Sequence, residues 1–212
     1  GLITVPYDSQ EDVYKAMFEE LTAAIDVLTR YADNGTTLLL PKADAVYGGD
    51  VHKWVVYANS LMLRLAMRVY ADQDLSKKYA MQAINHPYGV MRAKADEAKM
   101  DRGAGLVFQN NLDVLINQYN ECRMGSSMLA YLGGYQDPRL EKYFTTSTLP
   151  QAVSVDAMGN YLAVPTGHDV SSNNTFKGAS RPAITTATPT YWMRASEVYF
   201  LLAEAALHGF PV

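Results

Sequence analysis

The side chains that most often carry enzyme chemistry are few and scattered in this 212-residue chain. The four histidines, His52, His86, His168 and His208, lie far apart, and none is three or four residues from another, the spacing that metal-binding helices use. The lone Cys122 excludes a disulfide framework and a cysteine-based zinc cluster, so we expect it to be a small core residue. No phosphate-binding glycine loop, zinc-protease helix, nucleophile elbow or Cys-x-x-Cys motif occurs. The sequence therefore predicts no catalytic residue, no metal site and no cofactor.

Composition narrows the class of protein further. The net charge is −4, from 18 Lys and Arg against 22 Asp and Glu, and the absence of any basic run argues against nucleic-acid binding. No stretch approaches the ~18 consecutive apolar residues of a membrane helix, and the first residues lack the features of a signal peptide. Tyrosine, in contrast, is abundant, with 15 positions. Its ring offers an apolar face and a polar tip, which suggests a binding surface, although core packing accounts for part of the excess.

Apolar residues at helical spacing predict an all-α fold of antiparallel helices joined by long irregular segments, with few or no strands. In the first helix the packing stripe is expected to be Val13, Met17, Leu21, Ile25 and Leu28. Residues 145–188 are rich in Ser and Thr and lose the helical period, which indicates an ordered loop draped over the fold. The predicted helices cover about residues 10–31 after a Ser9 cap, 51–69 after an Asp50 cap, 75–85, 126–132, a short turn at 138–144, and 191–208.

The second and last helices are predicted to pack against each other through charged pairs. Arg64 and Arg68 lie one turn apart on a helix that is apolar over most of its circumference, so each needs a partner. Glu197 and Glu204 lie seven residues apart, hence on one face of the last helix, and are the expected partners. Trp54, on the packing side of the second helix, is predicted to belong to the core.

Aromatic and polar side chains in or beside irregular segments are the candidate ligand residues. Aromatic rings cover the apolar C–H faces of sugars, while amides and hydroxyls satisfy sugar hydroxyls. Tyr57 and Tyr199, in contrast, fall on predicted helix-packing faces. Each candidate also has a competing structural or solvent role. The candidates are Tyr47, Tyr135, Tyr161, His168, Asp169, Asn173 and Trp192.

Two helical blocks and a turn carry a family resemblance. Residues 48–68 contain Gly-Asp-Val-His-Lys-Trp followed by Ala-Asn-Ser-Leu-Met-Leu-Arg, and residues 194–209 contain Tyr-Phe-Leu-Leu-Ala-Glu-Ala-Ala. Between them lies Asp-Pro-Arg-Leu at residues 137–140. In this order, the three segments resemble the SusD/RagB family of nutrient-binding outer-membrane lipoproteins of Bacteroidota, in particular its SusD-like second branch. Residues 161–167 also resemble a Tyr-x-Gly-x-Pro-x-Gly loop of the family, with Ala163 in place of the first glycine.

The resemblance implies a scaffold of tetratricopeptide-like helix pairs. It covers the central part of a family member, so the lipid-bearing cysteine would precede Gly1 and more sequence would follow Val212. Within that part, residues 1–212 are expected to form one helical domain, with helices and short loops over 1–144, the long loop over 145–189 and a helix over 190–209.

The resemblance also implies a function and a partner. The leading hypothesis is non-enzymatic binding of a nutrient oligosaccharide by a lipid-anchored, surface-exposed outer-membrane protein, which delivers it to a SusC-type TonB-dependent transporter. The family motifs carry no ligand residue with them. Three alternatives stay open: a peptide-binding RagB-like importer component, a helical protein-interaction scaffold without a small ligand, and a glycoside hydrolase. The hydrolase would need two carboxyl groups ~5–9.5 Å apart across a cleft.

Overall fold

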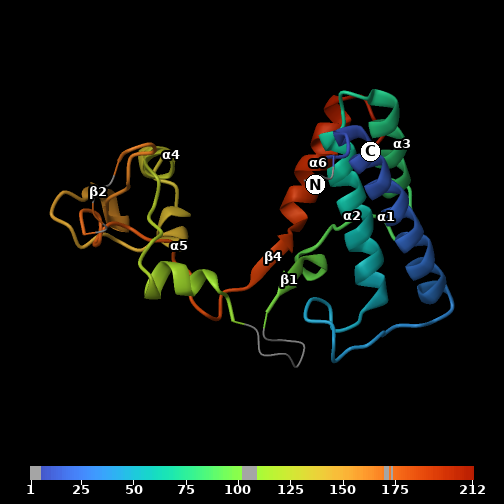
Figure 1. Ribbon diagram of the computed structural model, residues 1–212, viewed down its shortest axis with the longest axis horizontal. Coiled ribbons are helices and arrows are strands. Elements are labelled where there is room, and N and C mark those ends of the chain that lie inside the picture. Colours follow the sequence, from blue (N-terminus) through green and yellow to red (C-terminus); the bar gives the residue numbers. More distant parts are fainter. Residues whose placement is uncertain (1–5, 102–108, 170–171, 173) are drawn as a thin grey trace, which may run out of the picture. The chain divides into compact units, whose positions relative to one another are not determined.

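The computed structural model describes residues 6–101, 109–169, 172 and 174–212. Contacts divide the chain into two compact units (Figure 1). Unit 1 comprises residues 1–107 and 189–212, and unit 2 comprises residues 108–188. The described elements are mainly α-helical with a few short strands, which confirms the predicted fold class. That residues 1–212 form one domain stays a prediction.

Four helices make up most of unit 1, and they lie side by side (Figure 1). The second of them, α2, contacts each of the other three. In the core that they share, the ring of Phe18 stacks on the ring of Tyr79, with 4.0 Å between centroids. The helices are α1 (Gln10–Asp33), α2 (Val51–Arg68), α3 (Gln73–Ile84) and α6 (Ala195–Leu207).

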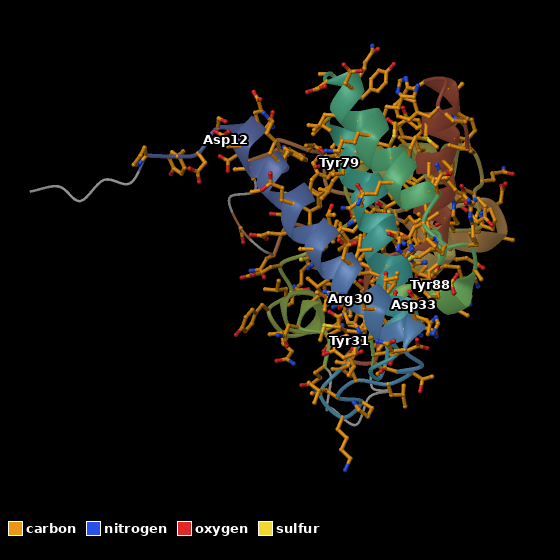
Figure 2. All side chains as sticks on the ribbon, turned by 90° about the vertical axis from the view of Figure 1, so that its right-hand side faces the viewer. Asp12, Arg30, Tyr31, Asp33, Tyr79 and Tyr88 are labelled. Atoms are coloured by element: carbon orange, nitrogen blue, oxygen red, sulfur yellow. The ribbon has the colours of Figure 1, made fainter. Side chains whose placement is uncertain are left out.

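Side-chain caps begin the first three helices. Each of these helices begins within two residues of its predicted start. The side chain of Ser9 accepts from the backbone N–H of Asp12, and the side chain of Asp50 accepts from that of Lys53. At the other end of α1, the Tyr88 hydroxyl donates to Asp33 across 2.8 Å, and the two side chains meet in Figure 2. The two caps satisfy N–H groups at the helix starts, and the Tyr88–Asp33 bond ties the end of α1 to the segment that follows α3.

The packing face of α1 differs from the predicted stripe. Ile25 is buried as expected, but Val13 is 38 % exposed and Met17 is 44 % exposed, whereas Phe18 is fully buried. The helix is turned so that the phenylalanine ring reaches Tyr79 of α3. Burying an aromatic ring against another removes more apolar surface than burying Met17.

The start of the last helix was also predicted wrongly. Residues expected to open it form strand β4 (Thr190–Met193) instead, antiparallel to β1 (Ala98–Met100). The run Thr-Tyr-Trp has high strand propensity, and pairing with β1 satisfies its backbone. Tyr199 of α6, expected on a packing face, is 51 % exposed.

Unit 2 combines short helices with a small hairpin. Strands β2 (Val153–Val155) and β3 (Gly159–Tyr161) pair antiparallel within the Ser/Thr-rich segment. The helix and the turn predicted near residues 126 and 138 are present as α4 and α5. A small core gathers Met124, Leu132, Leu140, Val155 and Tyr161. The helical elements of the unit are α4 (Ser126–Gly134), α5 (Leu140–Tyr143), the π-helix η3 (Val114–Gln118) and the 3-10 turn η4 (Asp156–Met158); η1 (Lys94–Asp96) belongs to unit 1.

Within the described part of the chain, no helix combines the length and apolar character that a membrane crossing requires.

Candidate ligand-binding site

A depression of about 530 Å³ lies in unit 1, where the start of α2 meets the loop before it and strand β4. Its lining is largely apolar and includes Leu39, Leu40, Val51 and Met100. Two indole rings complete it, Trp54 from α2 and Trp192 from β4. We call it the aromatic depression. Apolar pockets with a few placed polar groups are the usual form of small-ligand sites.

Trp54 is the centre of a cluster of four aromatic rings. Its indole meets Tyr47 edge-on at 5.2 Å and Tyr57 edge-on at 5.6 Å, and it lies tilted against Trp192 at 6.3 Å. Trp54, predicted to be a core residue, is half-buried, and Trp192 is 40 % exposed. The cluster therefore supports one indole ring, that of Trp192, at the surface of the depression.

The orientation of Trp54 is fixed by Asp44. The indole Nε1–H donates to Asp44 Oδ2 across 2.7 Å, and the backbone N–H groups of Val46, Tyr47 and Gly49 also donate to this carboxylate. Burial opposes the ionised form, but the indole and the three backbone donors outweigh it and lower the pKa of Asp44. Asp44 is thus an ionised acceptor whose four bonds saturate its two oxygens.

A glycine closes the loop that carries Asp44. Gly49 has a φ of +85°, and a Cβ on it would lie 2.3 Å from the backbone oxygen of Leu39. The two residues are bonded through Leu39 N–H and Gly49 C=O across 2.8 Å. Only a residue without a side chain permits this approach in the left-handed region.

Trp192 sits on an irregularity of the β-ladder. Ala98 pairs with Met193 and Lys99 pairs with Tyr191, so Trp192 is the extra residue of a bulge. Its carbonyl accepts from Arg64 Nη2 across 3.0 Å. Bulges re-aim side chains, and this one presents the indole to the depression.

The guanidinium that binds this carbonyl is also held by α6. Arg64 donates to both carboxylate oxygens of Glu197, at 2.6 Å from Nε and 2.8 Å from Nη2. One turn along, Arg68 contacts Glu204 across 3.4 Å. Both predicted arginine–glutamate pairs are therefore confirmed. The contact of Arg64 with Trp192 was not predicted, because it arises from the bulge.

Of the candidate ligand residues, Tyr47 and Trp192 come together in unit 1 around Trp54. The Tyr47 hydroxyl donates to the backbone oxygen of Asp96 across 2.7 Å, and burial, helped by nearby acidic groups, raises its pKa. Tyr47 thus supports Trp54 from below the surface, while Trp192 is the more accessible ring.

The other candidates belong to unit 2. Tyr135 is 80 % exposed, whereas Tyr161 is 1 % exposed and donates to the backbone oxygen of Met158 across 3.1 Å, so its ring is part of the core. His168 and Asp169 are exposed, and the His168 ring lies edge-on to Phe176 at 6.0 Å. No hydrogen bond or ring contact joins these four candidates to one another in the described part of unit 2. The seventh, Asn173, lies outside the described residues.

Sequence reasoning missed Asp44 and Arg64 as parts of a site. Neither lies in a recognisable motif for binding, and their roles depend on contacts made only after folding. Among the described residues, no three His, Cys, Asp or Glu side chains are placed to hold a metal ion.

Comparison with known proteins places the chain in a family. The family model described as SusD-like, Susd and RagB outer membrane lipoprotein, matches residues 1–212. A search of curated proteins found no match.

Solved structures similar to this chain carry the same family name. A chitin-binding SusD homologue from Flavobacterium johnsoniae is 35 % identical, with a TM-score of 0.86 over 98 % of this chain and 42 % of that one. A SusD-like protein from Bacteroides thetaiotaomicron is 30 % identical, with a TM-score of 0.85 over 100 % of this chain and 42 % of that one. A SusD homologue from Bacteroides vulgatus is 32 % identical, with a TM-score of 0.82 over 96 % of this chain and 40 % of that one. The chain thus spans less than half the length of these relatives.

Proposed function

Because the chain belongs to the SusD-like family of outer-membrane lipoproteins, we propose that it binds a nutrient oligosaccharide at the cell surface. We further propose that the lipid-anchored protein hands this ligand to a SusC-type TonB-dependent transporter. One relative is a chitin-binding SusD homologue, which supports a carbohydrate as the ligand class. The role is binding, not catalysis.

The observation that carries the proposal is the indole of Trp192 in the aromatic depression. Its ring is 40 % exposed, and its backbone is fixed by Arg64. A sugar ring that stacks on an indole hides its apolar C–H face from water and keeps its hydroxyls at the edge. A rigid ring loses little conformational freedom on binding, which favours affinity.

The carboxylate of this depression supports binding over hydrolysis. Asp44 is the one acidic residue among its described lining residues, and its pKa is lowered. A glycosidase needs a carboxylic acid with a raised pKa and a second carboxyl group across the cleft. Asp44 suits neither role, because its oxygens already accept four hydrogen bonds.

A peptide is the second candidate ligand, favoured by the leucines at residues 38–40. Leu38 is 56 % exposed and Leu40 is 77 % exposed, and Leu40 has a left-handed φ of 48°. Leu39 and Leu40 line the depression. Apolar side chains at the wall of a pocket match apolar peptide side chains better than sugar hydroxyls.

Calorimetry and tryptophan fluorescence on the full-length protein test the ligand class. The panel contains neutral and acidic oligosaccharides, including soluble chitin oligosaccharides, and peptides of matched length. We expect a glycan to bind and to change the tryptophan emission, and Trp192→Ala to weaken this binding about tenfold. Phe200→Ala, which removes a 77 % exposed ring of α6, is the matched control and leaves the affinity unchanged.

Three results would count against parts of the proposal. Binding of peptides alone supports the second candidate, and release of shorter sugars from a bound glycan means that the protein is an enzyme. Failure to bind any ligand supports the interaction scaffold. Co-purification with a TonB-dependent β-barrel from the same membrane tests the partner.

A further inference from the structure

Two exposed tyrosines form a pair at the C-terminal end of helix α4 of unit 2, Tyr131 within the helix and Tyr135 as its C-cap. Tyr131 is 68 % exposed and Tyr135 is 80 % exposed. Their ring planes differ by only 18°, and their centroids are 6.4 Å apart. Aromatic side chains usually gain stability by burial, so two nearly parallel rings left in solvent are a surface that binding can use.

A strained polar pair adjoins these rings. Gln136 follows Tyr135 directly and has a φ of 51°, and Asp156 has a φ of 38°. These are two of the four non-glycine residues with positive φ in the described part of the chain. Their side chains are hydrogen-bonded to each other, the Gln136 amide donating to the Asp156 carboxylate. Left-handed backbone at such residues costs about 1–3 kcal/mol each, and it clusters at ligand sites.

The core of unit 2 fixes both segments. Leu132, which follows Tyr131, and Val155, which precedes Asp156, are both buried in that core. The turn after α4 is closed by backbone bonds from Gln136 N–H to Gly133 O at 3.1 Å and from Asp137 N–H to Leu132 O at 2.8 Å. The rings and the polar pair are therefore attached to segments that the core of unit 2 and these backbone bonds hold in place.

We propose that Tyr131, Tyr135, Gln136 and Asp156 form a second carbohydrate-binding site, located on unit 2. The rings cover the C–H face of a sugar, the Gln136 amide donates to and accepts from its hydroxyls, and the Asp156 carboxylate accepts from them. The site goes beyond the aromatic depression of unit 1 and rests on the proposed function only for the class of ligand. The polar pair favours a sugar over a protein partner, because a protein-binding surface is depleted of acidic side chains at its centre.

The chain offers a way to observe the two sites separately. Both of its tryptophans, Trp54 and Trp192, belong to unit 1. The emission change that Trp192→Ala removes therefore reports binding at the aromatic depression, whereas binding at the unit 2 site is detected by calorimetry. The same oligosaccharide panel is titrated into the full-length protein that carries Trp192→Ala.

In this background, we expect Tyr131→Ala combined with Tyr135→Ala to weaken the calorimetric binding at least about tenfold. Tyr119→Ala removes a 63 % exposed tyrosine of the same unit and is the matched control, with unchanged affinity. Unchanged affinity in the double variant overturns the second site. If the double variant instead loses only the association with a protein partner, the surface is a protein interface and the proposal is also overturned.

Gln136→Gly separates a ligand role from a structural one. Glycine adopts a φ of 51° without strain, so we expect the unfolding midpoint to hold or rise while glycan affinity falls about three- to tenfold, the value of one hydrogen bond. Unchanged affinity removes Gln136 from the site.

Two outcomes separate failure of the second site from failure of the proposed function. Absence of binding to every glycan, with no change in emission of the unsubstituted protein, contradicts the proposed function as well. A change in emission without any effect of the unit 2 variants contradicts the second site alone.

Discussion

The guanidinium of Arg64 donates both to the Glu197 carboxylate and to the carbonyl of Trp192. It thereby links α2, α6 and the bulge of β4 through one side chain. Its geometry is fixed because a planar guanidinium binds a carboxylate bidentately. The side chains of Arg64 and Glu197 are 28 % and 41 % exposed, so water weakens the pair without removing it. Arg64 is a positioning residue for the exposed indole.

Replacement of Arg64 tests this role. We expect Arg64→Ala to lower the free energy of unfolding by about 1–2 kcal/mol and to weaken glycan binding, because the Trp192 carbonyl loses its donor. Arg68→Ala is the control one turn away, and its single 3.4 Å contact between more exposed groups should contribute less than about 1 kcal/mol. Urea unfolding and calorimetry measure both quantities. Equal effects of the two substitutions would contradict a special role of Arg64.

The stability of unit 1 is expected to depend on pH through His86. Tyr88 N–H donates to His86 Nδ1 across 3.2 Å, and Thr29 Oγ1 lies 3.2 Å from Nε2. Burial lowers the pKa of His86 below its usual 6.5, against the opposing effect of the Asp26 and Asp33 charges. The neutral ring that accepts from Tyr88 is therefore the form that the fold favours.

Acidification should therefore weaken the fold through His86. Because the pKa is lower in the folded chain, the unfolded chain binds the proton first, so this stabilisation is present above pH 6.5 and is lost as the pH falls through the folded value. The free energy of unfolding is measured in urea at about pH 7.5 and at about pH 5.5. Its decrease between the two pH values should be smaller for His86→Gln than for the unsubstituted chain. A loss of the same size in both proteins would assign the effect to other groups.

Among the elements, those fixed by local signals are the ones that the sequence predicts well. The caps at Ser9 and Asp50 and the apolar periodicity fix where α1 and α2 begin. Residues 191–193 continue the apolar pattern of α6, yet they form part of strand β4, because β1, about 90 residues earlier in the chain, pairs with them. Periodicity carries no information about such a partner.

In the candidate site, too, some residues could be selected from the sequence, whereas the roles of others depend on contacts that form only on folding. Position in or beside irregular segments selected Tyr47 and Trp192, which the fold brings together around Trp54; that they contact a ligand stays a prediction. It also selected Tyr161, which the hairpin of unit 2 buries. Asp44 could not be predicted, since its function depends on four donors that only the closed loop assembles.

Substitutions of two neighbouring glycines test the closure of the loop that carries Asp44. Gly49→Ala would place a Cβ 2.3 Å from a backbone oxygen, whereas a Cβ on Gly48, with a φ of +61°, meets nothing within 4 Å. We expect Gly48→Ala to cost about 1 kcal/mol of left-handed strain and Gly49→Ala to cost about 3 kcal/mol or more. Urea unfolding measures the loss, and tryptophan emission reports the release of Trp54. Equal costs for the two substitutions would contradict the close approach to Leu39.

At the scale of the whole molecule, the two units have cores of different size. Unit 1 buries an extensive cluster to which each of its four long helices contributes, for example Phe18 of α1, Leu63 of α2, Ala80 of α3 and Val198 of α6. The core of unit 2 is a small group around Met124, Leu132 and Leu140, with most of the unit in irregular segments. Stability rises with the apolar surface that a compact unit buries, so unit 2 should be the less stable of the two.

The two units should therefore unfold in separate steps. Tryptophan emission follows unit 1 alone, because Trp54 and Trp192 both lie there, while far-UV circular dichroism follows both units. We expect Leu140→Ala, at a fully buried position of unit 2, to lower the stability of that unit by about 2–4 kcal/mol and to leave the emission midpoint in urea unchanged. Leu63→Ala, at an equally buried position of unit 1, should move the emission midpoint. If Leu140→Ala shifts both signals together, the two units unfold as one. In that case the units that the contacts define are not independent in stability.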